Sequence, residues 1–184
     1  NWSSKWLNIF GPSGCGKTHL SKILEKKIKK IKIVDAQKVD NNLIGNLGNF
    51  DCLIVDNFNN QINQHLYYSL LNQSKQIDNY IVINSIMPLK KFNFNLPDLK
   101  SRFDSFIFSG IDLPTDDLLQ VIITKSFSDK QVNLDPKISK YIIKHVERSY
   151  DKMFKFLKNV DDLSLSSGKS ININLIKKVI EKNE

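Results

Sequence analysis

Apolar residues in the first part of the chain form short continuous runs that alternate with stretches of helical spacing. Continuous apolar runs predict strands that are buried on both faces, as in a parallel sheet. Apolar residues that recur every three or four positions predict helices between them. Together the two patterns predict an α/β fold with a doubly wound, five-stranded parallel sheet. Its strands are expected at 6–10, 31–35, 50–57, 80–85 and 105–108, and its main helices at 17–29 and 61–77.

After Pro114 the helical spacing takes over. Helices are predicted to begin near Thr115, Asp135, Ser149 and Ile173, with Thr115 and Asp135 as N-caps. We therefore expect an α/β core over residues 1–112 and an all-helical lid subdomain over residues 113–184. Residues 36–51, rich in Asn and Gly, are expected to form a loop with at most a short helix.

A glycine-rich turn joins the first strand to the first helix and reads Gly11-Pro12-Ser13-Gly14-Cys15-Gly16-Lys17-Thr18. Glycine, four residues and then Gly-Lys-Thr is the pattern of a phosphate-binding loop. Its glycines permit positive φ angles, and its backbone N–H groups point at an anion next to a helix N-terminus. Lys17 is expected to reach the β- and γ-phosphates of ADP or ATP, and Thr18 to ligate Mg²⁺. The expected nucleotide-binding residues are Gly11, Pro12, Ser13, Gly14, Cys15, Gly16, Lys17, Thr18 and His19.

Polar residues close two of the later predicted strands. Asp56 ends the third strand at the edge where α/β sheets place ligands, which makes it a Walker B candidate that holds Mg²⁺ through water. Asn57 follows Asp56, and its side chain can hydrogen-bond a water without taking its proton. Asn84 or Ser85 is a candidate sensor of the γ-phosphate or the attacking water. The alternative is that this pair only caps the strand.

The excess of positive charge allows two interpretations. Lys and Arg total 27 against 19 Asp and Glu, a formal net charge of +8. Such a charge invites a nucleic-acid partner, although charge alone is not sequence readout. The alternative is that lysines such as Lys26, Lys27, Lys29 and Lys30 solvate a helix end, so direct DNA binding is not favoured. The cysteines Cys15 and Cys52 have no metal-ligand spacing, which suits a reduced cytosolic protein, and neither a membrane span nor a signal peptide is expected.

These motifs occur in the order of a known family. The chain resembles AAA+ ATPases of the DnaA/Hda group and, within it, the Hda regulators of alphaproteobacteria. The resemblance covers nearly the whole chain, although the family's motif around Arg102 is only moderately specific. The residues that carry it are Leu96-Pro97-Asp98-Leu99-Lys100-Ser101-Arg102, Asp116-Asp117-Leu118-Leu119, Phe127-Ser128-Asp129-Lys130-Gln131 and Glu147-Arg148-Ser149.

The resemblance implies roles that spacing alone does not give. Arg102 falls at the family's arginine finger, which acts in trans on a neighbour's nucleotide. Arg148 falls at the sensor II position on the lid. The alternatives are a surface arginine for Arg102 and one basic residue among several for Arg148. The pair Asp56-Asn57 departs from DnaA and matches Hda, so at most slow hydrolysis by this chain is expected.

The family also implies partners in a bacterial cytoplasm. These are the DnaA initiator, a DNA sliding clamp reached through an N-terminal segment not present in this sequence, and a second copy of the chain. The span from Val34 to Cys52 is too short for the helices with which DnaA grips single-stranded DNA, and a DnaA-type helix-turn-helix is not found after Lys182.

The leading hypothesis is therefore a regulator that promotes hydrolysis of DnaA-bound ATP. An AAA+ initiator or loader with nucleotide-dependent DNA binding is the alternative. A third reading, an autonomous ATPase or small-molecule kinase, is disfavoured by Asn57 and by the lack of an acceptor-site signature.

Overall fold

The computed structural model describes residues 4–132 and 134–183, and the chain divides into two compact units. The first unit runs up to Pro12 and resumes over Gly16–Asp112. The second unit contains Ser13–Cys15 and the chain from Leu113 onward. Part of the glycine-rich turn is thus counted with the second unit, and each unit is described by itself.

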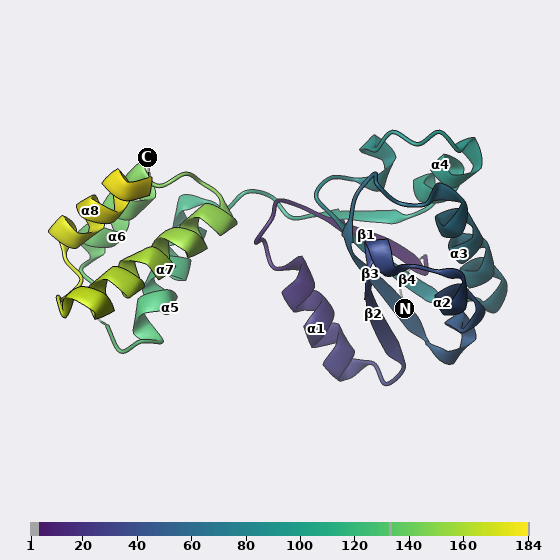
Figure 1. The fold of residues 1–184 in the computed structure, drawn as a ribbon, viewed down its shortest axis with the longest axis horizontal. Coiled ribbons are helices and arrows are strands. Elements are labelled where there is room, and N and C mark those ends of the chain that lie inside the picture. The colour runs from purple at the N-terminus through teal and green to yellow at the C-terminus, as the bar shows by residue number, and fades with distance from the viewer. Residues whose placement is uncertain (1–3, 133, 184) are drawn as a thin grey trace. The chain divides into compact units, whose positions relative to one another are not determined.

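The first unit is built on a five-stranded sheet in the order β2-β3-β4-β1-β5, with every neighbouring pair parallel (Figure 1). This confirms the predicted α/β fold with a parallel five-stranded sheet. The last strand begins later than the predicted residue 105, because the Ser105 and Phe106 N–H groups bond back to the carbonyls of Arg102 and Phe103. The strands are β1 (Trp6–Phe10), β2 (Ile31–Asp35), β3 (Cys52–Phe58), β4 (Tyr80–Ser85) and β5 (Ile107–Gly110).

Both faces of the sheet are apolar, as its continuous apolar runs predict. Alternate residues of the central strands enter two separate cores. Leu53 and Ile81 lie in the core under helices α3 (Gln64–Ile77) and α4 (Pro97–Asp104), whereas Ile54 and Val82 lie on the face covered by α1 (Lys17–Lys27). The segment between β2 and β3, predicted as a loop with at most a short helix, contains the short helix α2 (Asn41–Gly45) and two 3₁₀ helices, at Ala36–Lys38 and Leu47–Asn49.

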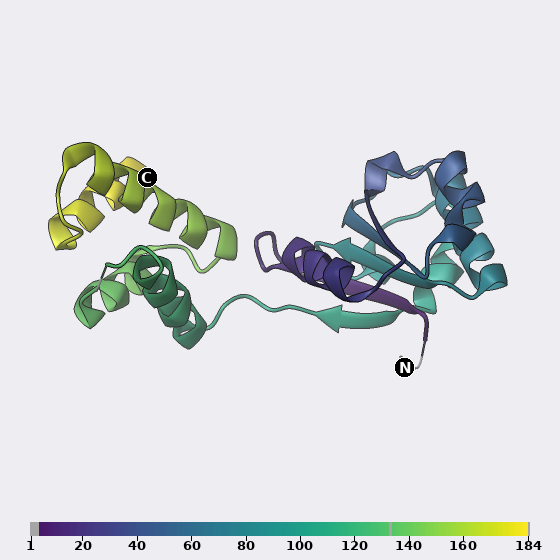
Figure 2. The same ribbon diagram turned by 90° about the horizontal axis from the view of Figure 1, so that it is seen from below.

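The described residues of the second unit form helices α5 to α8, which share a core of their own (Figures 1 and 2). Thr115 and Asp135 cap two of them, as predicted, and Ser149 caps a third; each accepts a backbone N–H from the first turn. The third helix continues to Ser167, where Gly168 ends it in the left-handed conformation. The helices are α5 (Asp116–Ser128), α6 (Pro136–His145), α7 (Tyr150–Ser167) and α8 (Ile173–Asn183).

Across the residues described, we find no helix that combines the length and the apolar character needed to span a bilayer.

Candidate functional site

The glycine-rich turn follows β1 directly and delivers the chain into α1. Gly16 is the N-cap of α1, and its φ of 97° lies in the left-handed region that glycine adopts without strain. The Leu20 N–H donates to the Gly16 carbonyl at 2.8 Å, which closes the first turn of the helix. The Lys17 Nζ donates to the carbonyls of Gly11 at 2.8 Å and Pro12 at 2.9 Å, so this lysine folds back over the start of the turn.

Thr18 and Asp56 come together although 38 residues separate them in sequence. The Thr18 hydroxyl donates to Asp56 Oδ2 at 2.7 Å. Asp56 lies at the carboxyl end of the buried part of β3 and is 7% exposed. Its other oxygen, Oδ1, accepts the Asn57 backbone N–H at 3.1 Å. The two residues that the sequence assigned to Mg²⁺ are therefore in direct contact.

Asn84 is the third member of this cluster. Its amide nitrogen donates to Asp56 Oδ1 at 3.1 Å and to the Ser21 hydroxyl at 2.8 Å. Among the described residues its Oδ1 atom is buried without a hydrogen-bond partner. Since a buried acceptor left unpaired is costly, this oxygen suits a water or another donor that enters the site. Sequence reasoning missed Ser21, because an exposed-looking serine in the second turn of a helix gives no signal.

Ser85, the other sensor candidate, is engaged elsewhere. Its hydroxyl donates to the Met87 carbonyl at 2.7 Å and accepts the Asn8 side-chain amide at 2.9 Å. Asn8 also accepts the Leu89 N–H at 3.1 Å, so this pair anchors the loop that follows β4. Of the two candidates, Asn84 contacts the site and Ser85 fits the strand-end cap that was the alternative interpretation.

Asn57 points its amide toward a neighbouring strand. The residue adopts a φ of 58°, next to a register irregularity between Val55 and Phe58. Its Nδ2 donates to Asp35 Oδ2 at 2.9 Å, at the end of β2. This hydrogen bond, a second from the Gln37 N–H and the charge of Lys38 hold the pKa of Asp35 below its usual value. Asp35 was not predicted as a site residue, because its partner lies 22 positions away.

The described residues fit a Mg²⁺–nucleotide pair. Mg²⁺ keeps several waters and takes few protein ligands beside substrate phosphates, so one hydroxyl and one carboxylate suffice. Thr18 and Asp56 would hold the ion, and the Gly16–Lys17 turn would bind the phosphates. His19 is exposed on α1, next to Thr18.

Arg102 lies away from this cluster. It belongs to the last turn of α4, just before β5 begins, and lines a groove with Lys5 and Trp6 at the start of β1. This is the amino-terminal edge of the parallel sheet, whereas Lys17, Thr18 and Asp56 lie at the carboxyl edge. The structure therefore does not bring Arg102 to the candidate phosphate-loop residues of its own chain.

Arg148 belongs to the second unit. Its guanidinium donates to Asp116 at 3.0 Å, and both side chains are exposed. Its predicted place at the nucleotide stays a prediction.

Of the two cysteines, Cys15 is half-buried, whereas burial raises the pKa of the Cys52 thiol to about 11.

Known proteins resemble this chain in sequence and in structure. The family model described as "Hda, lid domain" matches residues 116–180. The chromosomal replication initiator protein DnaA of Buchnera aphidicola is 24% identical over 199 residues, which cover 96% of this chain and 45% of that protein. DnaA of Corynebacterium jeikeium is 25% identical over 165 residues, covering 78% of this chain and 28% of that protein. The chain thus spans less than half the length of these curated relatives.

Solved structures match the fold. Domain III of the Thermotoga maritima replication initiation protein DnaA superposes with a TM-score of 0.75 at 16% identity, covering 96% of this chain and 83% of that one. The Thermotoga maritima RuvB branch migration motor gives a TM-score of 0.72 at 22% identity, covering 96% and 61%. A replication initiator DnaA bound to AMPPCP and single-stranded DNA gives 0.69 at 17% identity, covering 90% and 59%. The AAA+ fold predicted from the motifs is confirmed.

Proposed function

This chain is an AAA+ protein of the DnaA/Hda type, and from that premise we propose that it regulates replication initiation by promoting ATP hydrolysis in a DnaA partner. In this proposal it binds ADP or ATP with Mg²⁺ at its own phosphate loop. It then offers Arg102 to the ATP of the partner. The sliding clamp and a second copy of the chain stay proposed partners, and a bacterial cytoplasm stays the proposed location.

The separation of Arg102 from the phosphate loop is the observation that carries the proposal. An arginine finger stabilises negative charge on a γ-phosphate and accelerates hydrolysis by about 10³–10⁵-fold when it arrives from outside. Arg102 is half-buried at the amino edge of the sheet, with its helix anchored by the buried residues Leu99 and Phe103. An arginine on an anchored helix that lies away from its own phosphate loop is suited to serve another site.

The chain's own site supports binding more than hydrolysis. Asp56 receives hydrogen bonds from Thr18, Asn84 and the Asn57 backbone, and so is occupied in fixing the site. Mg²⁺ would neutralise phosphate charge when bound. Asn57 has no proton-accepting group for an attacking water, and its amide is held by Asp35. We therefore propose that this chain hydrolyses ATP slowly and keeps its bound nucleotide for a long time. In this proposal Asn84 senses the γ-phosphate or the attacking water, the role called sensor I, and Arg148 takes the sensor II position.

The test is ATP hydrolysis by a DnaA partner with and without this chain. Arg102→Ala should leave nucleotide binding by this chain unchanged and reduce stimulation by at least about 10³-fold, because the finger alone would supply that factor. Lys100→Ala is the matched control, since Lys100 is exposed on the same helix. Lys17→Ala should abolish nucleotide binding by this chain.

Normal stimulation by the Arg102→Ala variant would refute the finger role. Fast turnover by the chain without a partner, lost in Lys17→Ala, would instead support an autonomous ATPase.

A further inference from the structure

Arg102 lines a groove of about 400 Å³ at the amino edge of the sheet. Three segments that are distant in sequence form it, namely the start of β1, the end of α3 and the end of α4. Its basic and aromatic lining consists of Lys5, Trp6, Lys75 and Arg102, and Asp78 supplies a carboxylate. The groove thus has more positive than negative charge.

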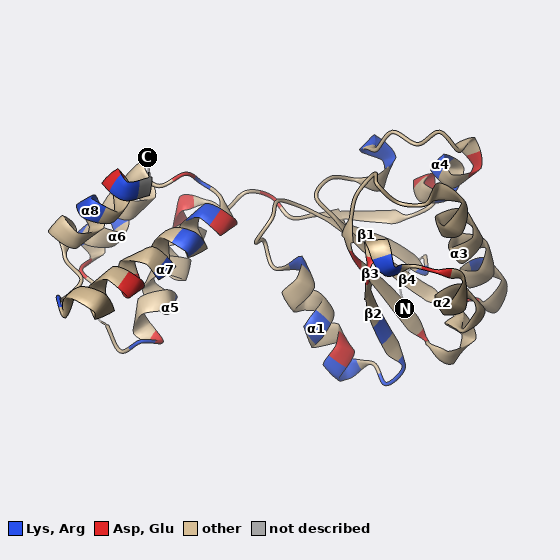
Figure 3. Cartoon of the chain, in the orientation of Figure 1, with Lys and Arg blue, Asp and Glu red and all other residues tan. Residues whose placement is uncertain are grey.

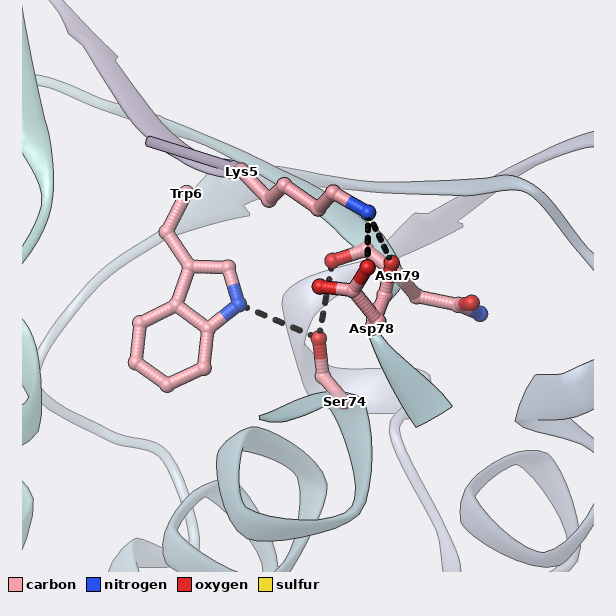
Figure 4. Close-up of polar contacts among 5 residues, drawn as sticks. All are labelled: Lys5, Trp6, Ser74, Asp78 and Asn79. Carbon is pink, nitrogen blue, oxygen red and sulfur yellow. Dashed lines mark hydrogen bonds and ion pairs between the residues drawn. The ribbon is translucent and has the colours of Figure 1, made fainter. Parts of the chain in front are cut away.

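Hydrogen bonds join several residues that line the groove (Figure 4). The Trp6 Nε1–H donates to the Ser74 hydroxyl at 3.1 Å, and that hydroxyl donates to the Asn79 carbonyl at 3.2 Å. The Trp6 ring also packs, tilted by 36°, against Phe106, which follows α4, with 5.4 Å between the ring centroids. Ser74 is fully buried and directly precedes Lys75, so the last turn of α3 has a fixed position beside β1.

In the part of the chain that the structure describes, some charged side chains of the groove form ion pairs and others do not. Lys5 forms an ion pair with Asp78 and also donates to the Asp78 carbonyl at 2.8 Å (Figure 4). The one carboxylate of the groove is therefore neutralised by Lys5. Within residues 4–132 and 134–183, neither the Lys75 ammonium nor the Arg102 guanidinium has an ion-pair partner. Two cations consequently remain available on adjoining helix ends.

Two unneutralised cations on a rigid groove suit an anion with closely spaced charges. Terminal phosphates of a nucleoside triphosphate are such an anion, and charge-assisted hydrogen bonds to them are about twice as strong as neutral ones. Arg102 can bind phosphate oxygens through its planar fork, while a lysine acts as a point charge. The two side chains would therefore contribute in different ways.

We infer that this groove binds the terminal phosphates of a triphosphate held by the neighbouring protein, and that Lys75 is its second phosphate-binding residue beside Arg102. The inference rests on the proposed function, because it names a further residue for the same trans interaction. In this arrangement Lys5 has a different task. It neutralises Asp78 so that the carboxylate does not repel the phosphates.

The first experiment measures stimulation of ATP hydrolysis in a DnaA partner by the full chain. Lys75→Gln should lower stimulation about tenfold, the effect of losing one hydrogen bond to a charged group. Lys29→Gln is the matched control, because Lys29 is exposed in the turn before β2, at the opposite end of the sheet from β5. Nucleotide binding at the chain's own loop serves as a readout that Lys75→Gln should leave unchanged.

The second experiment needs no partner. Inorganic tripolyphosphate is titrated into the Lys17→Ala variant, whose own loop is disabled, and binding is followed by calorimetry at low salt. Saturable binding should weaken about tenfold in Lys17→Ala/Lys75→Gln and remain unchanged in Lys17→Ala/Lys29→Gln.

Together the two experiments distinguish a failure of the inference about the groove from a failure of the proposed function. Stimulation that needs Arg102 but is the same for Lys75→Gln and Lys29→Gln would overturn the inference and leave the proposed function standing. Tripolyphosphate binding that depends on Lys75 without any stimulation of the partner would support the groove as a phosphate site and refute the proposed function. Absence of both effects would overturn both.

Discussion

At the scale of single residues, the site depends on one carboxylate with three different donors. Thr18 and Asp56 could be predicted from sequence, because a fixed loop pattern and a strand-end rule place both at one edge of the sheet. Asn84 could be predicted only as one of two candidates. Its contact with Ser21, 63 positions away, depends on how α1 packs against β4 and gives no local signal.

The contact between Asp35 and Asn57 was even harder to predict from the sequence. The sequence shows that an amide replaces a second acid after Asp56, but not where this amide points. Asn57 lies at a backbone irregularity that turns it toward β2, where Asp35 accepts its hydrogen bond. An acid at position 57 would place a second carboxylate against Asp35, which gives a physical reason for the asparagine.

The pairing of Asp35 predicts a pH-dependent effect on stability. Asp35→Ala should lower the free energy of unfolding at pH 7 by less than about 1 kcal/mol, since the carboxylate is largely solvated. The pKa of Asp35 is lowered in the folded protein, so its contribution is present above the ordinary value of 3.8. That contribution is lost as the pH falls through the folded-state pKa. Urea unfolding of both proteins should therefore show a difference at pH 7 that shrinks in acid.

Asp35→Asn is the control for that experiment, because it keeps an acceptor oxygen and removes the charge. The difference in free energy of unfolding between this variant and the wild type should also shrink in acid. A difference between wild type and Asp35→Ala that is the same at every pH would contradict the role of the charge.

At the scale of elements, an aromatic cluster connects the strand that carries Asp56 to the helix that carries Arg102. Phe58 follows Asn57 on β3, and its ring lies 5.5 Å, centroid to centroid, from that of Phe103, which follows Arg102 on α4. Phe92 and Tyr67 also pack edge-on against Phe58. The positions of Asp56 and Arg102 are therefore set by one shared core.

The strands of this unit were predictable, whereas α4 was not assigned as a helix. Apolar runs of the length of β3 and β4 leave few alternatives to buried strands. Helix α4 has only eight residues, with Pro97 at its start and a single buried pair, Leu99 and Phe103, one turn apart. Such a short segment has almost no periodicity of its own, and its helical state depends on the aromatic cluster beneath it.

Phe103→Ala should lower the free energy of unfolding by about 3–5 kcal/mol, as expected for a buried aromatic replaced by a methyl group. Chemical denaturation of the full chain measures this loss. Ile86→Ala is the control from the same unit, since Ile86 is 62% exposed and should change stability by less than about 0.5 kcal/mol. Equal losses in both variants would show that the aromatic cluster does not stabilise the unit.

At the scale of the whole molecule, a change from α/β to all-helical patterning and an excess of positive charge were both visible in the sequence. The change of periodicity near Pro114 predicted a helical second part, and the helices there share a separate core. Net charge, in contrast, says nothing of where the charge gathers. Lysines follow one another at the end of α1 and in the turn to β2 (Figure 3), away from the groove of Arg102 on the opposite side of the sheet.

This distribution predicts the kind of DNA binding that the chain should show. Lys26, Lys27, Lys29 and Lys30 are exposed and bring no aromatic residue with them for stacking bases. Binding to single-stranded DNA should therefore be weak, indifferent to sequence and steeply dependent on salt. Replacing these four lysines with glutamine should flatten the plot of log affinity against log salt by about 0.7 for each phosphate that the variant no longer neutralises.

Fluorescence anisotropy of a labelled oligonucleotide, measured from about 50 to 200 mM salt with ADP or ATP present, tests this expectation. Because the lysines lie away from Lys17, Thr18 and Asp56, the identity of the nucleotide should not change the affinity. Binding that persists at the higher salt concentration and requires ATP would mean that the positively charged residues belong to a specific DNA-binding site. That result would favour an initiator or loader over a regulator that acts through Arg102.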